Sequence, residues 1–168
     1  MIAANRYHDI SVGHRVHGHE SKCAHLHGHN YRIHFEVVAP QLDKVGRVLD
    51  FSVIKSQLCE WLERNWDHKF LMWVDDPVMT RLAAWVERTA RQKIDYNPFL
   101  KQNVENSDWA AAWKSFVHVP FNPTAENMAQ YLVEVVGPAQ LAGFDCTLQR
   151  VVIEETRKCS CSYTRKDK

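Results

Sequence analysis

Two segments near the start of the chain alternate apolar and polar residues with a period of two, as strands with one buried face do. In the first, residues 10–16, His14 shares a face with Ile10, Val12 and Val16. In the second, residues 27–37, the corresponding face carries His27, His29, Tyr31, Ile33, Phe35 and Val37. The loop 16–24 that joins them is too short for a crossover, so we expect an antiparallel pair.

Helical spacing replaces this alternation further along the chain. Ser52 is expected to cap a helix that runs to about Asn65, with an apolar stripe formed by Ile54, Leu58, Trp61 and Leu62. A second helix is expected to begin near Asn122 or Thr124, either of which would cap it, and to end at the Gly-Pro pair 137–138.

The expected order of elements indicates an α+β domain. Two more strands, residues 149–155 and 161–164, follow the second helix and complete a four-stranded antiparallel sheet with two main helices on one face. Such a sheet keeps exposed edges, and we expect copies of the chain to pair along them into a closed homo-oligomer. The length of 168 residues suits a single domain, residues 1–168.

Residues 75–120 form a longer segment than a plain connection between the two helices, and we expect an insertion there. Its start opens a helical pattern that carries Val78, Met79, Leu82, Trp85 and Val86. A second apolar cluster contains Trp109, Trp113 and Phe116. Aromatic residues at helical spacing belong to a core more often than to a cofactor site, so extra packing or an oligomer contact is expected.

Charge and composition exclude several classes of function. The 21 basic and 20 acidic residues leave a net charge of +1, which gives no electrostatic footprint for a nucleic acid or an anionic membrane. No apolar run is long enough to span a bilayer, and the first residues lack the charged and apolar blocks of a signal peptide. We therefore expect a cytoplasmic protein whose five cysteines are reduced thiols.

Histidines in the two N-terminal strands form a candidate metal site. His27 and His29 leave the same face of their strand, and Gly28 between them would let the backbone approach an ion. His14 on the buried face of the other strand supplies a third ligand, and three protein ligands with an open fourth position are typical of catalytic zinc. Loop histidines are weaker alternatives, because loops hold a ligand geometry less rigidly. These alternatives are His17, His19 and His25.

A thiol and an acid–base pair add candidate catalytic groups. Cys23 closely precedes the paired histidines, which places a nucleophile or base beside the metal. A free thiol is mostly protonated at neutral pH, and an imidazole held by a carboxylate would raise its thiolate fraction. Asp67 and His68 offer such a pair, although an Asp-His dipeptide alone is usually a solvated helix end.

Five motifs, in order, make the chain resemble the family of 6-pyruvoyl- and 6-carboxy-tetrahydropterin synthases. They are Cys23–Asn30, Gly46–Phe51, Asp67–Leu71, Asn122–Asn127 and Ile153–Thr156. The resemblance covers about residues 1–74 and 120–165. It implies zinc on His14, His27 and His29, and catalytic roles for Cys23, Asp67, His68 and Glu155. It also implies substrate contacts by Glu155, Thr124 and Glu126.

Glu155 is the residue that the resemblance assigns to the pterin ring. Its strand parity matches that of Val151 and Ile153, so it is an acid on an apolar face and needs a partner. The amino group and ring N–H of a pterin are suitable donors to this carboxylate. The alternative is that neighbouring backbone amides donate to Glu155.

The resemblance further implies the tunnelling fold, whose sheets associate into trimers, often stacked as hexamers, with active sites between subunits. The three residues between Cys23 and His27 resemble the 6-carboxy-tetrahydropterin synthases of queuosine biosynthesis. Those enzymes convert 7,8-dihydroneopterin triphosphate to 6-carboxy-5,6,7,8-tetrahydropterin, with release of acetaldehyde and triphosphate. The alternatives are the pyruvoyl synthase, which eliminates triphosphate, and a non-catalytic metal- or pterin-binding protein.

Overall fold

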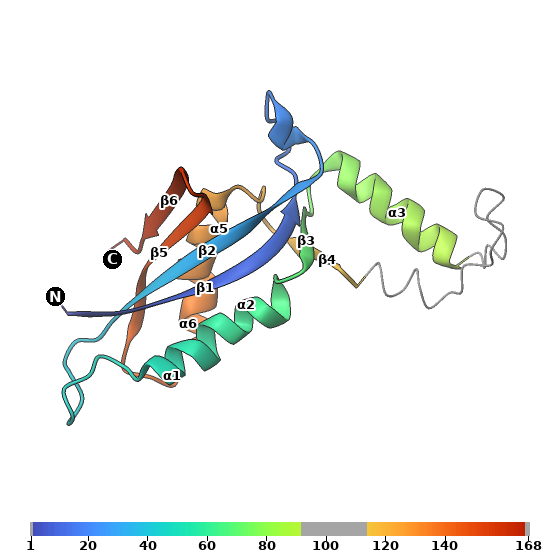
Figure 1. Cartoon of the computed structure of the whole chain (residues 1–168). Helices are drawn as coiled ribbons and strands as arrows, with labels where there is room; N and C mark the ends of the chain where they lie inside the picture. Colours follow the sequence, from blue (N-terminus) through green and yellow to red (C-terminus); the bar gives the residue numbers. More distant parts are fainter. Residues whose placement is uncertain (1, 92–113, 167–168) are drawn as a thin grey trace.

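The chain folds around one six-stranded sheet with the strand order β4-β3-β1-β2-β5-β6 (Figure 1). The computed structural model describes residues 2–91 and 114–166. The strands are β1 (Ala3–His14), β2 (His27–Val38), β3 (Lys69–Trp73), β4 (Phe116–Val119), β5 (Thr147–Thr156) and β6 (Cys159–Thr164). The expected α+β class is confirmed, and the sheet has two strands more than the four expected.

The expected antiparallel strands form the longest part of the sheet. β1 and β2 pair from Ala3↔Val38 to His14↔His27, β2 pairs with β5, and β5 pairs with β6. The alternation predicted for β2 holds, because Tyr31, Ile33, Phe35 and Val37 are buried, whereas the alternating residues Arg32, His34 and Glu36 are more exposed. The sheet therefore has one apolar face, and this face carries the core.

Two composite helices cover the apolar face of the sheet (Figure 1). The first consists of α1 (Phe51–Ile54), the π-helical segment η2 (Lys55–Cys59) and α2 (Glu60–Asn65). The second consists of α5 (Ala125–Tyr131), the π-helical segment η3 (Leu132–Val136) and α6 (Gly137–Gln140). Their apolar stripes pack on the strands, and Leu58, Leu62, Met128 and Leu132 are almost fully buried.

Two details of the helix ends differ from the prediction. The first helix is capped by Asp50, whose carboxylate accepts hydrogen bonds from the Ser52 amide at 2.8 Å and from the Ser52 hydroxyl at 2.6 Å. A Ser52 cap is predicted, but the carboxylate of Asp50, two residues earlier, is the cap and accepts from the Ser52 amide. The second helix continues past Gly137, because a proline is tolerated in the first turn of α6 and Gly137 packs against Leu148.

The two additional strands come from outside the antiparallel set. β3 pairs parallel with the end of β1 at Val12↔Lys69 and Gly13↔Phe70, and β4 pairs parallel with β3. The predicted helix of the 75–120 segment is α3 (Pro77–Arg91), which lies beyond β3 and β4, away from the two main helices (Figure 1). Trp109 and Trp113 lie outside the described residues. None of the helices in the described part of the chain is long and apolar enough to cross a membrane.

Candidate active site

Three histidines converge at the end of the β1–β2 hairpin. His14, His27 and His29 each offer one ring nitrogen, and these three atoms lie within 4.8 Å of one another. The register explains this, because His14 pairs with His27 and Val12 pairs with His29, which puts all three side chains on the apolar face. The structure thus brings together the three residues that the sequence predicts as metal ligands.

The hydrogen bonds around these rings leave nitrogen lone pairs facing the centre of the cluster. The Nδ1 atom of His14 lies 2.6 Å from the carbonyl oxygen of Pro123, and that of His27 lies 2.8 Å from the carbonyl oxygen of His25. A carbonyl only accepts, so both Nδ1 atoms carry the proton and both Nε2 atoms keep a lone pair. The buried Nε2 atoms of His27 and His29 have no hydrogen-bond partner. Unpartnered imidazole nitrogens of this kind fit a zinc ion.

Burial favours the neutral form of His14. The His14 side chain is almost fully buried, and this burial lowers its pKa below the usual value, although the bond to Pro123 acts in the opposite direction. A neutral imidazole is the form that ligates a metal, so the protein holds His14 ready for an ion.

Gly28 also determines how closely the two metal-bearing strands approach each other. A Cβ atom at this position would lie 2.8 Å from the carbonyl oxygen of Val12 and 3.3 Å from the Cα atom of Gly13. The missing side chain therefore allows β1 and β2 to approach each other at the Gly13↔Gly28 pair. The glycine serves the metal site by holding His14 and His27 on closely spaced strands.

Glu155 reaches the same cluster from β5. Its Oε1 atom lies 3.3 Å from the Nε2 atom of His29 and accepts a hydrogen bond of 3.3 Å from the Tyr31 hydroxyl. The contact with His29 lacks hydrogen-bond geometry, since that Nε2 atom remains unpartnered. Tyr31 has no exposed surface, and burial raises its pKa far above the usual range, so the hydroxyl keeps its proton.

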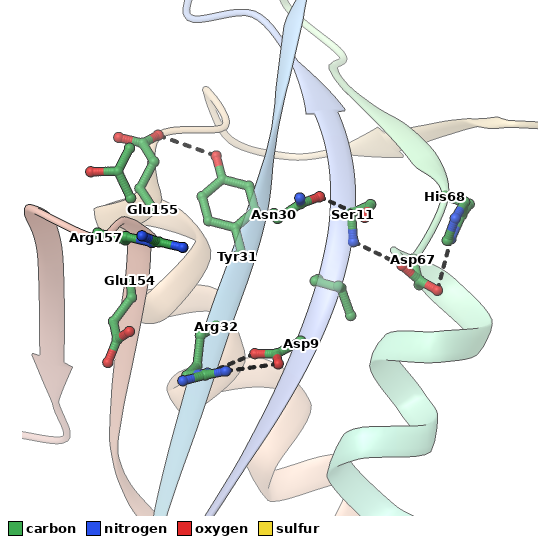
Figure 2. A pocket seen from close by; sticks show the side chains of 12 residues that line it. Asp9, Ser11, Asn30, Tyr31, Arg32, Asp67, His68, Glu154, Glu155 and Arg157 are labelled. Atoms are coloured by element: carbon green, nitrogen blue, oxygen red, sulfur yellow. Dashed lines mark hydrogen bonds and ion pairs between the residues drawn. The ribbon is translucent and has the colours of Figure 1, made fainter.

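A cavity of about 870 Å³ adjoins this cluster, and Asp67, His68, Tyr31 and Glu155 are among the residues that line it. Figure 2 shows Glu155 and Tyr31 on one side of β2, and the Asp67–His68 pair on the far side of β1. Most other charged groups of the cavity are already paired, as Arg32 is with Asp9 and Glu154 is with His34. None of the three clustered histidines lines this polar cavity. It meets the cluster through Tyr31 and Glu155, which contact His14 and His29.

The predicted Asp67–His68 pair is formed. The Nδ1 atom of His68 lies 2.9 Å from the Asp67 Oδ2 atom, and Asp67 Oδ1 accepts a 2.8 Å hydrogen bond from the Ser11 amide. Burial alone would raise the pKa of Asp67, but the hydrogen bonds from Ser11 and His68 outweigh this effect. The pKa is therefore below its ordinary value, and the carboxylate is charged. His68 has a left-handed backbone (φ 53°) and a side chain that is 81% exposed, which aims the imidazole outward.

Cys23 lies in a short 3₁₀ turn, η1 (Lys22–Ala24), within the loop that joins the two metal-bearing strands. Its carbonyl accepts a 2.7 Å hydrogen bond from the Val16 amide, which closes the loop, and its side chain is half-buried. Cys23 therefore lies in the loop between the strand that carries His14 and the strand that carries His27 and His29.

The two remaining predicted contacts lie at the start of α5. The Thr124 side chain accepts a hydrogen bond of 3.2 Å from the Asn127 amide and caps the helix. Glu126 is exposed, and its charge adds to the effect of burial, which is the main cause of the raised pKa of Cys161. Neither residue is among those that line the large cavity, so their roles toward a substrate stay predictions.

The loop histidines have other surroundings. His17 Nδ1 lies 3.9 Å from the buried carboxylate of Asp76, and His19 Nδ1 accepts a hydrogen bond of 3.0 Å from the Ser21 amide. His25 is exposed, and only its carbonyl contacts the cluster, through His27. Within the described residues, the only group with metal-binding geometry is the one formed by His14, His27 and His29.

Sequence reasoning missed the groups that orient the ligands. The Pro123 carbonyl and the Tyr31 hydroxyl both contact His14, at 2.6 Å and 3.1 Å. Tyr31 was assigned to the core because of its strand parity, and its hydroxyl was the signal that a polar partner had to be near. Nothing in the sequence marks the backbone oxygen of Pro123 as a contact of a residue in β1.

Comparison with known proteins agrees with these motifs. Residues 4–166 match the family described as 6-pyruvoyl tetrahydropterin synthase. A Rickettsia felis protein named 6-carboxy-5,6,7,8-tetrahydropterin synthase is 32% identical over 159 residues, which cover 95% of this chain and 97% of that protein. A Rickettsia typhi protein of the same name is 31% identical over the same shares of the two chains.

Solved structures share the fold. An uncharacterized protein from Wolinella succinogenes superposes with a TM-score of 0.76 at 24% identity, over 98% of each chain. The 6-pyruvoyl tetrahydropterin synthase of Caenorhabditis elegans gives a TM-score of 0.54 at 21% identity, over 98% of this chain and 96% of that one. These likenesses confirm the expected tunnelling fold. The family match and the Rickettsia relatives show that the chain belongs to the 6-pyruvoyl tetrahydropterin synthase family.

Proposed function

We propose that the chain is a zinc-dependent lyase that converts 7,8-dihydroneopterin triphosphate to 6-carboxy-5,6,7,8-tetrahydropterin, with release of acetaldehyde and triphosphate. The relatives named above carry the name of this enzyme, and the spacing of Cys23 and His27 agrees with it. The product would serve queuosine biosynthesis in the cytoplasm. The single observation that carries the proposal is the cluster of three imidazole nitrogens within 4.8 Å, beside a cavity that Glu155 also lines.

His14, His27 and His29 would hold the zinc ion. When bound, zinc would polarise the side-chain hydroxyls of the substrate and lower their pKa. Two of the three rings are fixed by hydrogen bonds to backbone carbonyls, so the ligands need little rearrangement to bind.

The other candidate residues divide the remaining work. Cys23 would move a proton at the side-chain carbon next to the pterin ring, and Glu155 would bind the amino group and ring N–H of the pterin. Asp67 orients His68 through the 2.9 Å contact, and His68 would promote thiolate formation at Cys23. Thr124 and Glu126 would contribute at the edge of the site.

The geometry also supports assembly of several copies of the chain. His68 is 81% exposed and lies on the far side of β1 from Glu155 (Figure 2). Among the described residues, β3 pairs with β1 only at Val12 and Gly13, so no described strand pairs with the outer edge of the first part of β1. β6 is the last strand on the other side of the sheet. We propose that open edges pair between copies into a trimer-based homo-oligomer, and that His68 serves a site completed by a neighbouring copy.

A product assay tests the reaction. Purified protein with equimolar zinc is incubated with 7,8-dihydroneopterin triphosphate, and the pterin product, acetaldehyde and triphosphate are measured. The expected result is 6-carboxy-5,6,7,8-tetrahydropterin with one acetaldehyde per turnover. A 6-pyruvoyl product without acetaldehyde would replace the proposal by the pyruvoyl synthase, and pterin binding without turnover would replace it by a binding protein.

Metal content tests the ligand set. His27→Ala should remove bound zinc, whereas His34→Ala should retain it, because His34 lies on the same strand but on the opposite face, paired with Glu154. Full zinc content in His27→Ala would redirect the assignment to His17, His19 and His25.

A further inference from the structure

Tyr31 lies between a candidate metal ligand and the candidate anchor of the pterin ring. Its hydroxyl oxygen is 3.1 Å from the Nε2 atom of His14 and 3.3 Å from the Oε1 atom of Glu155. The side chain has no exposed surface, so water does not compete for either contact. The contact with Glu155 is drawn in Figure 2.

A count of protons shows that the two contacts compete. The Nδ1 atom of His14 donates to the Pro123 carbonyl, so its Nε2 atom is an acceptor. Glu155 also accepts from Tyr31. The phenol has one proton, and it can donate that proton fully to only one of the two acceptors.

Metal binding would end this competition. An ion held by the Nε2 atom of His14 uses the lone pair that otherwise accepts from Tyr31. The Tyr31 proton is then left with Glu155 as its acceptor. The Nε2 atom of His29 lies 3.3 Å from the same carboxylate oxygen without hydrogen-bond geometry, and its lone pair would also face the ion, so Tyr31 remains the donor to Glu155.

We propose that Tyr31 is a positioning residue that couples metal occupancy to recognition of the pterin ring. With the metal bound, Tyr31 donates to one oxygen of Glu155 and fixes the carboxylate, which leaves its other oxygen and remaining lone pairs for the ring donors. Without the metal, the hydroxyl is shared with His14 and the carboxylate is held less firmly. This inference rests on the proposed function, because it needs both the zinc site and the role of Glu155.

Coupling of this kind is a difference between binding constants and can be measured without turnover. The probe is 6-methyl-7,8-dihydropterin, which has the ring but no side-chain hydroxyl that could ligate zinc. Its dissociation constant is measured by calorimetry for the zinc-free and the zinc-loaded protein. The ratio of the two constants reports the coupling.

The wild-type protein should bind the probe on the order of tenfold more tightly when zinc is present, within the usual range for a coupling between sites. Tyr31→Phe keeps the buried ring and removes only the hydroxyl, so its ratio should fall to about one while its zinc content stays full. Tyr7→Phe is the matched control, because Tyr7 is 53% exposed and lies near His34 on the opposite face of the sheet. The ratio in Tyr7→Phe should equal that of the wild type.

Two results would overturn the inference: a wild-type ratio near one, or a wild-type ratio retained in Tyr31→Phe. Circular dichroism of each variant, free and zinc-loaded, establishes that the fold is intact before the ratios are compared. If the wild-type protein binds neither zinc nor the probe, the proposed function itself fails. If both bind and Tyr31→Phe leaves the ratio unchanged, only the role of Tyr31 fails.

Discussion

Replacement of Asp76 by alanine is expected to destabilise the fold by about 3.5 kcal/mol, because this buried carboxylate both pairs with Arg15 and caps a helix. Asp76 is 1% exposed and its Oδ2 atom lies 3.1 Å from the Nε atom of Arg15. Its Oδ1 atom accepts hydrogen bonds from the amides of Val78 at 2.9 Å and Met79 at 3.3 Å, which caps α3. Alanine would remove the cap and leave the Arg15 guanidinium buried without its anion.

The two losses set the magnitude. Removal of one partner of a buried ion pair costs about 3–5 kcal/mol, and loss of a helix cap costs about 0.5–2 kcal/mol. The Arg15 Nε atom has no hydrogen bond of good geometry, so the pair is held by charge attraction alone. The Arg15 side chain is also 14% exposed, so we take the low end of both ranges. Asp76→Asn keeps an oxygen for the cap and loses the charge, and should fall between the wild type and the alanine variant.

The measurement is urea unfolding at fixed protein and zinc concentrations, because binding of metal and of other copies shifts apparent stability. The control is Asp75→Ala, an exposed neighbour whose removal should change the free energy of unfolding by less than about 0.5 kcal/mol. If Asp76→Ala is no less stable than Asp75→Ala, the buried pair does not hold α3 to the metal-bearing strand.

Three further predictions concern the site and its surroundings. Gly28→Ala should weaken zinc binding about tenfold or more, measured by chelator competition, because the new Cβ would meet the Val12 carbonyl at 2.8 Å; unchanged affinity would contradict the close approach. Burial raises the pKa of Cys161 to about 11 from an ordinary 9.0, so at pH 8 it should hold roughly a hundredfold less thiolate and be alkylated long after exposed Cys159. Equal alkylation rates would show that Cys161 is not desolvated. Cys23→Ala should retain zinc and pterin but lose turnover by roughly two orders of magnitude or more, and near-normal turnover would remove this thiol from the mechanism.

The strand period made the metal ligands predictable. An alternation of two puts His27 and His29 on the face of Ile33 and Phe35, and the same parity puts His14 on the buried face of β1. The close approach of the two strands at Gly28 could not be predicted, because it depends on the distance between strands, which a single strand pattern does not contain. The antiparallel part of the sheet followed from the same local signals.

The parallel strands could not be predicted in this way. β3 and β4 are short, and they pair with strands far away in the sequence, at Val12↔Lys69 and Phe70↔Phe116. No local sequence signal predicts such a pairing, whereas the short loop between β1 and β2 predicts that these two strands form a hairpin. The Asp50 cap was missed for a different reason, since both Asp50 and Ser52 are good caps and local propensity does not choose between them.

The local strand pattern predicts which histidines are ligands, but it does not predict how every ring is oriented. His27 is fixed by the His25 carbonyl in its own loop, whereas His14 is fixed by the Pro123 carbonyl, which precedes α5. Asn122 strengthens this second link, because its side chain binds both the amide and the carbonyl of His17 at 2.9 Å and 2.8 Å. The segment before α5 is therefore hydrogen-bonded to the end of β1 and to the loop after it. We expect a shift of the second composite helix to change the orientation of the His14 ring and to leave the His27 ring in place.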